Sequence, residues 1–258
     1  MPRCSKATNP RGIEIIFEEE SHKYSSIINN KEILYTSGTT FVGKFFPKFD
    51  PTGQITLKCA QKRGLTVEAL KAQWKEKSIN SCIFGTKIHE TCEDTLLNNT
   101  LRNKPNNNRE HFSMIVAQKA AKMIMEKCEI LGIEKIIFDE QLKIAGTMDL
   151  FTKSKKDGKL WIIDWKTNEK IETENTYKNF GLKPIEHIPS TNFGHYDMQL
   201  NLYEYILKEV GYVDKNVEIG KCLIHITEKG SKTYLIETHQ KEISDMIEIY
   251  KNQMEIKQ

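Results

Sequence analysis

The hairpin-like segment from residue 146 to residue 166 constrains the fold of this 258-residue chain more than any other part. It reads GTMDLFTKSKKDGKLWIIDWK and consists of two largely apolar runs around Asp157-Gly158. An Asp-Gly pair between two such runs is a strong signal for a tight β-hairpin. With Asp157 and Gly158 as the whole loop, residues 149 and 166 would lie opposite each other. Both faces are apolar along most of the hairpin, which is typical of central strands that helices cover on both sides.

Three charged residues interrupt this hairpin at one end. Asp149, Asp164 and Lys166 are separated by even steps along and across the strands, so we expect them on one face. The expected apolar neighbours on that face are Phe151, Leu160 and Ile162, and those on the opposite face are Met148, Leu150, Trp161, Ile163 and Trp165.

The two carboxylates of this group need a partner. Removing a lone charge from water costs on the order of several kcal/mol, and two carboxylates about one cross-strand diagonal apart also repel each other. A hard divalent cation that bridges their oxygens removes both problems. Beside it, Lys166 could orient or help to deprotonate an attacking water and offset the charge that develops on a phosphate. The alternative interpretation is a structural Asp–Lys ion pair across the hairpin.

The rest of the chain predicts a mixed α/β (α+β) sheet with helices on its faces. Strand-like patterns occupy residues 13–35, with a turn at Asn29-Asn30, and residues 135–142, 146–153, 159–166, 220–227 and 232–238. Helical patterns occupy residues 39–46, 57–78 with Thr66 as N-cap, 81–97, 110–131 with Gly132 as C-cap, 196–209 and 240–254.

Three further expectations concern the ends and connections of these elements. Residues 1–11 are expected to be a frayed tail. The apolar stripe of the 110–131 helix, which includes Phe112, Met123 and Ile130, is expected in the core. The long connector 168–195 leaves the DWK strand directly, so it should border any cleft at that point.

Composition limits the class of protein. The net charge of +3 permits an anionic partner without arguing for one. The six cysteines form no CxxC pair, which indicates neither a zinc knuckle nor a disulfide framework and favours reduced thiols in a cytoplasmic protein. The N-terminus MPRCSKATNPRG lacks an apolar signal-peptide core, and no stretch approaches about 18 apolar residues. We therefore expect neither secretion nor a membrane span.

Four motifs in order resemble the PD-(D/E)XK nuclease superfamily. GTMD (146–149) and DWK (164–166) match its Asp and D-x-K motifs on adjacent strands, although Met148 stands where the superfamily often has Pro. GTKIHE (85–90) is similar to the upstream helix of the RecB-like branch, whose His ligates metal, and QLNLY (199–203) is similar to its Q-x-x-x-Y signature. Residues 35–50 look like the front end of viral and mitochondrial exonucleases of that branch.

The resemblance implies a restriction-endonuclease-like core and a Mg²⁺- or Mn²⁺-dependent deoxyribonuclease. His89, Asp149, Asp164 and the backbone carbonyl of Trp165 would hold the metal, and Lys166 would act on the attacking water.

The resemblance also implies roles for residues around this centre. Glu140 would assist the metal, or is an ordinary carboxylate at the edge of a strand. Glu93 shares a helix face with His89 and could support it. Gln199 and Tyr203 would position the lysine or the DNA backbone, or form a half-buried polar patch. Since Cys222 alone follows the Q-x-x-x-Y helix, no iron–sulfur cluster is expected.

A basic region precedes the motifs. Next to a nuclease site, Lys62 and Arg63 could hold phosphates and Trp74 could stack on a base of single-stranded nucleic acid, although a Lys-rich helix is usually a solvated face. Thr39 and Lys44, in the short 39–46 helix, are further candidates for contacts with nucleic acid.

We expect a single nuclease domain over residues 1–258, with a DNA-contacting N-terminal region at 1–80 and the core at 81–258. The expected function is an exonuclease that acts on single-stranded DNA or DNA ends in phage or viral replication, recombination or repair. Such an enzyme would be a cytoplasmic monomer, in the host cytoplasm if it is viral. The alternatives are a structure-specific endonuclease of the same fold and a catalytically silent nucleic-acid-binding module.

Overall fold

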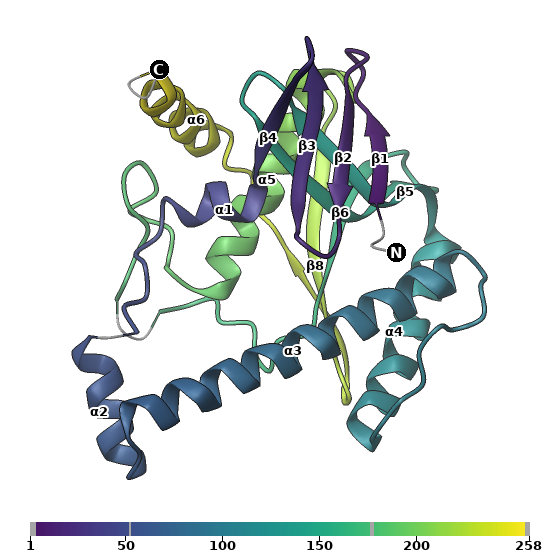
Figure 1. The fold of residues 1–258 in the computed structure, drawn as a ribbon. Coiled ribbons are helices and arrows are strands. Elements are labelled where there is room, and N and C mark those ends of the chain that lie inside the picture. Colours follow the sequence, from purple (N-terminus) through teal and green to yellow (C-terminus); the bar gives the residue numbers. More distant parts are fainter. Residues whose placement is uncertain (1–3, 52, 176–177, 256–258) are drawn as a thin grey trace.

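The structure is a computed structural model that describes residues 4–51, 53–175 and 178–255. Within these ranges, nine strands form one mixed sheet and six helices flank it (Figure 1), which confirms the predicted fold class. The strand order is β1-β2-β3-β4-β6-β7-β8-β9, and β5 pairs with β6 outside this path. No helix in the described ranges is both long enough and apolar enough to cross a membrane.

The first four strands of the sheet form an antiparallel meander. Its strands are β1 (Cys4–Thr8), β2 (Glu14–Glu18), β3 (Lys23–Ile28) and β4 (Lys31–Ser37). The predicted turn is confirmed, because Asn29 and Asn30 have positive φ angles of 51° and 58°. The expected frayed tail is wrong for residues 4–8, which pair with β2 along their whole length. The mostly exposed CSKAT strand has no apolar face to reveal it in the sequence, and the backbone ladder holds it instead.

The helical region differs from the prediction because one expected break between helices is absent. Its helices are α1 (Gly38–Gly43), α2 (Gln54–Arg63), α3 (Val67–Leu96) and α4 (Asn108–Lys127). Thr66 is the N-cap of α3 as predicted, and its side-chain oxygen accepts a hydrogen bond from Ala69 N at 3.1 Å. The helix continues through residues 79–80, where we expected a break, because neither Gly nor Pro interrupts it there. Figure 1 shows α3 as a long rod that carries α2 at its far end.

The end of α4 was predicted too late. The helix stops at Lys127, and the chain turns directly into β5 (Cys128–Asp139), so Ile130 lies in a strand. Gly132 is therefore no helix cap but lies at a register shift of the β5–β6 ladder. Phe112 and Met123 are 52% and 51% exposed, so the predicted core stripe is wrong at both positions. The apolar residues just after Lys127 fit a helix or a strand equally well by their pattern, and pairing with β6 makes them a strand.

The C-terminal half contains the predicted hairpin. Its elements are β6 (Ile144–Ser154), β7 (Leu160–Lys166), α5 (Asn192–Val210), β8 (Ile219–Thr227), β9 (Gly230–Leu235) and α6 (Gln240–Glu255). The predicted register was wrong by two residues, because Leu150 pairs with Ile163. The loop includes residues 155–158 and is closed by a hydrogen bond from Ser154 N to Lys159 O at 2.8 Å. A shift of two residues leaves the paired side chains, residues 150–153 and 160–163, on their predicted faces.

Helices cover both faces of the central strands. Phe151 and Ile162 pack on the side of α1, α5 and α6, whereas Leu150 and Ile163 pack on the side of α3 and α4. Met148 was expected with Leu150 but packs with Phe151. The β6–β7 ladder ends at Leu150, so β6 leaves its neighbour there and the alternation of faces does not continue through Asp149.

Candidate active site

The site forms where β6 changes partners. On one edge β6 pairs with β5. On the other edge, β4 pairs with Ile144 and Ala145, and β7 pairs with residues 150–153. No strand in the described part of the chain pairs with that edge over residues 146–149, which are the GTMD motif. The motif is therefore open to side chains from other elements.

The Asp149 carboxylate connects three elements in this gap. Its Oδ2 atom accepts a hydrogen bond from Trp165 N of β7 at 2.7 Å and lies 3.4 Å from His89 Nδ1 of α3. The backbone of Trp165 thus lies at the site, while its indole packs in the cluster beneath α3 and α4. Gly85, one turn before His89, allows this approach, because a Cβ there would lie 3.3 Å from Thr167 Oγ1.

Asp164 and Lys166 form a buried ion pair beside Asp149. Burial and the negative charge of Asp149 raise the pKa of Asp164 to about 6, although Lys166 acts in the opposite direction. Within the described residues, Asp164 Oδ2 is buried and faces the Lys166 ammonium, with no other hydrogen-bond partner. This carboxylate therefore retains capacity for a cation.

Lys166 is a cation in this environment. Burial lowers its pKa, but the charges of Asp164 and Asp149 outweigh burial and leave the pKa raised. Its Nζ lies 4.3 Å from the centre of the Tyr196 ring of α5. Lys166 is thus held between the carboxylates and an aromatic face.

Glu134 is the acidic residue at this site that was missed in the sequence. One ligand atom each from His89, Glu134 and Asp149 lies within 4.8 Å of the other two. Glu134 stands between the pairs Ile133–Leu150 and Lys135–Met148, with a φ of 47°. Glu134 as a whole residue is exposed, while desolvation of its carboxylate and the charge of Asp149 raise its pKa. Glu134 was missed because it fell between the predicted helix, which ended at residue 131, and the predicted strand, which began at residue 135. The neighbouring Gly132 is the one feature of the sequence that could have indicated an irregular backbone there.

Glu140 was expected either to assist the metal or to be an ordinary carboxylate at the edge of a strand, and its contacts lie with the N-terminal region. It accepts a hydrogen bond from Asn9 Nδ2 at 2.8 Å and forms an ion pair with Arg11 at 2.9 Å. Glu140 thus ties the N-terminal strand region to the end of β5. Glu93 likewise faces another partner, since it pairs with Arg102 at 2.8 Å.

Gln199 and Tyr203 brace the GTMD strand. Gln199 Nε2 donates a hydrogen bond to the Tyr203 hydroxyl at 2.9 Å, and both side chains are buried. A Cβ at Gly146 would lie 2.5 Å from Tyr203 Cε1, so the ring needs a glycine at that position. Burial raises the pKa of Tyr203, which keeps its hydroxyl neutral. The motif on α5 therefore positions β6 at the start of the gap.

The donors fit a divalent metal ion. His89, Glu134 and Asp149 offer an imidazole nitrogen and two carboxylate oxygens within 4.8 Å of one another. Asp164, whose pKa the charge of Asp149 helps to raise, adds a further carboxylate nearby. Magnesium prefers oxygen ligands, whereas manganese accepts imidazole as well. A bound cation would also offset the repulsion by Asp149, which adds to the effect of burial in raising the pKa values of Asp164 and Glu134.

A polar groove of about 840 Å³ begins directly after Lys166. Residues 167–170 line one side, as the prediction for the connector requires, and α3 residues around Lys77 line the other. The lining includes three basic residues, Lys77, Arg109 and Lys170, and as many acidic ones, and Lys77 pairs with Glu169 at 2.9 Å.

The five candidates for nucleic-acid contacts lie in different places. Lys62 and Arg63 are exposed in the last turn of α2. Trp74 packs against Phe49 with a ring separation of 5.7 Å, and Lys44 Nζ lies 4.5 Å from the centre of the Tyr250 ring. Thr39 lines a cavity of about 280 Å³ that Gln199 and Tyr196 also line, so it is beside the site.

Comparison with known proteins identifies the family. The model described as "PD-(D/E)XK nuclease superfamily" matches residues 58–256. Among curated proteins, none matches the chain. A solved structure titled "Crystal structure of SSO0001" aligns at 13% identity over 69% of this chain and 88% of that chain, with a TM-score of 0.25. Because the family model spans more than half of the sequence and includes every motif of the site, the chain belongs to the PD-(D/E)XK nuclease superfamily.

Proposed function

We propose that this chain is a Mg²⁺- or Mn²⁺-dependent deoxyribonuclease that acts as an exonuclease. Members of the superfamily are typically metal-dependent nucleases, and their substrates are nucleic acids. The observation that carries the proposal is the convergence of Asp149, Asp164, Lys166 and His89 at the gap in β6. A structural ion pair needs one carboxylate and one lysine, and a second carboxylate beside them adds a desolvation cost without a partner charge. A bound cation explains why both carboxylates are present.

Four side chains would hold the metal, namely His89, Glu134, Asp149 and Asp164, together with the Trp165 carbonyl. When bound, the ion would supply a Lewis acid for the phosphate and make a water molecule easier to deprotonate. No iron–sulfur cluster belongs to this proposal.

The protein groups would divide the remaining work. Lys166, held as a cation, would donate a hydrogen bond to the attacking water and offset the negative charge that builds on the phosphate. Tyr196 restricts the Lys166 ammonium to one side of the site. Gln199 and Tyr203 act through Gly146 and are positioning residues.

The groove after Lys166 would receive the DNA strand. Arg109 and the exposed Lys62 and Arg63 would contact phosphates by charge, which gives affinity without sequence preference. Residues 1–80 would form a contacting region on the core at 81–258, within one nuclease domain. The likeness of residues 35–50 to viral and mitochondrial exonucleases supports a role for a monomer in viral or phage DNA replication, recombination or repair, in the host cytoplasm.

The test compares DNA with ends and DNA without ends. End-labelled linear DNA and a covalently closed circle are incubated with Mg²⁺, Mn²⁺ or EDTA. We expect mononucleotides or short products from the linear substrate, an intact circle, and no products in EDTA. Nicking of the circle would replace the exonuclease with a structure-specific endonuclease. DNA binding without any cleavage would leave a silent binding module, and cleavage in EDTA would overturn the metal proposal.

A further inference from the structure

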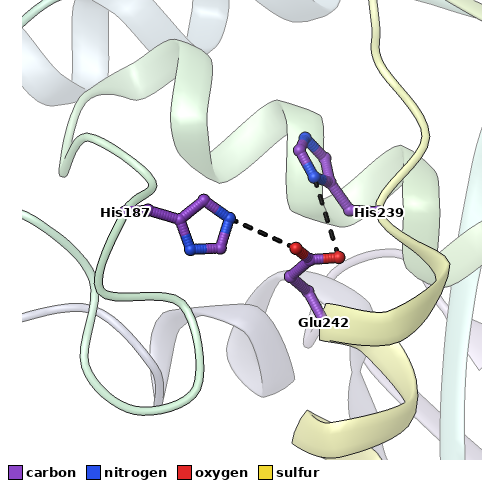
Figure 2. Close-up of side chains that lie close together, drawn as sticks. All are labelled: His187, His239 and Glu242. Atoms are coloured by element: carbon purple, nitrogen blue, oxygen red, sulfur yellow. Dashed lines mark ion pairs between the residues drawn. The ribbon is translucent and has the colours of Figure 1, made fainter.

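A second group of metal-binding side chains lies outside the candidate active site. His187 comes from the connector before α5, His239 from the segment before α6, and Glu242 from the first turn of α6 (Figure 2). One ligand atom of each lies within 4.8 Å of those of the other two. We propose that these three residues form a separate site for a divalent transition metal ion of the zinc type.

The distances suit one small ion between the three side chains. His187 Nε2 lies 3.2 Å from Glu242 Oε1, and His239 Nδ1 lies 3.9 Å from Glu242 Oε2. In a tetrahedral site with bonds of about 2.0–2.1 Å, neighbouring donor atoms lie roughly 3.4 Å apart. Figure 2 shows both rings with a nitrogen directed at the Glu242 carboxylate. Small side-chain rotations therefore bring all three donors onto one ion.

The His239 ring is oriented as in known metal-binding histidines. Its Nε2 lies 3.1 Å from Asp197 Oδ2 of α5, which leaves Nδ1 for the ion. Asp197 is itself fixed, because Asn201 Nδ2 donates to its Oδ1 at 3.0 Å. Asn201 Oδ1 also accepts the His239 backbone N–H at 2.9 Å. A carboxylate that fixes the second ring nitrogen of a ligand is a common feature of metal sites.

His187 is held in place by its neighbours while its ring remains accessible. Ile185 and Ile188, on either side, are buried in the part of the core that packs against α1, α5 and α6. Ile188 N donates a hydrogen bond to Ile185 O at 3.0 Å. The His187 side chain is 58% exposed, so an ion can enter from solvent. Since the backbone is already ordered, binding requires little further loss of conformational entropy.

The donor types favour a transition metal over magnesium. Two imidazole nitrogens and one carboxylate oxygen are typical ligands of zinc and of neighbouring divalent metals, whereas magnesium takes oxygen ligands and water. Three protein donors leave one tetrahedral position for water. The ion would join the connector to α6 and, through Asp197, to α5. Its effect is to stabilise the connector whose first residues line the substrate groove.

The test measures binding of Zn²⁺ alone to the full chain by equilibrium dialysis. The background protein carries Asp149→Asn, which weakens the candidate active site as a competing site. We expect one Zn²⁺ per chain in this background. Adding His187→Gln should weaken binding at least about 100-fold, and adding Asp197→Asn should weaken it about 10–100-fold, because the His239 ring loses its orientation. His111→Gln, an exposed histidine on α4, is the matched control and should not change the affinity.

Thermal unfolding provides a second measurement on the same proteins. Zn²⁺ should raise the Tm of the background protein and of His111→Gln, but not that of His187→Gln, because an ion that binds the folded state stabilises it. His187 is exposed, so its variant should fold normally. Equal Zn²⁺ affinity with and without His187 would overturn the site, as would the absence of Zn²⁺ binding; the cluster would then be an ion-pair group only. Either result leaves the proposed nuclease function unaffected.

Discussion

Asp149 is the carboxylate that repels the other acidic groups of the candidate active site. Its carboxylate is fixed by the Trp165 backbone, faces His89, and raises the pKa values of both Asp164 and Glu134. In the metal-free protein these carboxylates therefore destabilise each other. Such a local sacrifice of stability is typical of functional sites, where the charges are needed for the bound state rather than for folding.

Removal of the Lys166 ammonium should separate catalysis from binding. In Lys166→Ala, single-turnover cleavage should fall about 10²–10⁴-fold, because the lysine acts on the water and the phosphate. DNA affinity should stay within a few fold of wild type, since the residue is buried in the site. Lys153→Ala, an exposed lysine at the other end of the hairpin, is the control. Near-normal cleavage by Lys166→Ala would remove the lysine from the mechanism.

The stability of the metal-free protein should depend on the protonation of Asp164. Its pKa is about 6 in the folded state and about 3.9 when unfolded. The folded state therefore holds the proton more tightly between about pH 4 and pH 6. This contribution is complete below about pH 4 and is lost as the pH rises through about 6. At neutral pH the ionised group thus weakens the fold by on the order of 2–3 kcal/mol at most.

Asp149→Asn should reduce this loss. The neutral amide can still accept the Trp165 N–H but no longer raises the pKa of Asp164. Denaturant unfolding in EDTA should therefore show a variant that is more stable than wild type at pH 7 and little changed at pH 4. Asp164→Asn should not share the gain, because it leaves Lys166 buried without its ion-pair partner. A variant equally destabilised at both pH values would mean that Asp149 is mainly structural.

At the scale of elements, β6 is the strand on which the site depends. Its inner edge is shared by β4 and β7, and the residues between these two partners carry the functional motif. α5 fills the gap from one side with Tyr203, and α3 reaches it from the other with His89. The geometry of the site is therefore set by how closely α5 approaches β6.

Gly146→Ala should damage this contact. The added methyl would lie 2.5 Å from Tyr203 Cε1, so the ring or the strand must move. Overpacking of this kind costs about 1–3 kcal/mol, and cleavage should fall with it because Asp149 follows on the same strand. Urea unfolding and cleavage rates measure both effects. Gly43→Ala, where a Cβ meets nothing within 4 Å, should leave both nearly unchanged. A stable and fully active Gly146→Ala would show that the contact with α5 does not position the site.

At the scale of the whole molecule, α2 and the first half of α3 form an arm that extends from the nuclease core. Residues 75–83 of α3 are all exposed, and α2 packs at the far end of this helix (Figure 1). A charged helix of this kind can hold a flexible anionic polymer without a rigid interface. The arm is therefore placed to affect binding more than chemistry.

The double variant Lys62→Ala/Arg63→Ala should weaken DNA binding and leave the cleavage rate at saturating DNA unchanged. If each residue contacts one phosphate, the slope of log affinity against log salt should fall by about two. Lys156→Ala, in the exposed hairpin loop, is the control for a general loss of charge. Unchanged affinity and slope would exclude the end of α2 from the DNA path.

Local chemistry determined much of this protein. The Asn29-Asn30 turn, the Thr66 cap and the faces of the β6–β7 hairpin could be predicted because each depends on neighbouring residues or on the two-residue period of a strand. The hairpin pattern placed Asp149, Asp164 and Lys166 at the same end, even though the loop was longer than predicted and the alternation of faces stops before Asp149. The sequence by itself therefore specified the hairpin and the charged group at its end.

Only the tertiary structure decided which other groups join them. Glu134 faces Asp149 because of a local irregularity in the β5–β6 ladder, whose register is set by long-range pairing. Glu140, six residues later, forms an ion pair with Arg11 instead. His187 meets His239 and Glu242 because the connector packs its flanking isoleucines into the core. No local pattern encodes such contacts, since they arise when distant segments bury apolar surface together and the polar groups between them take the partners that remain.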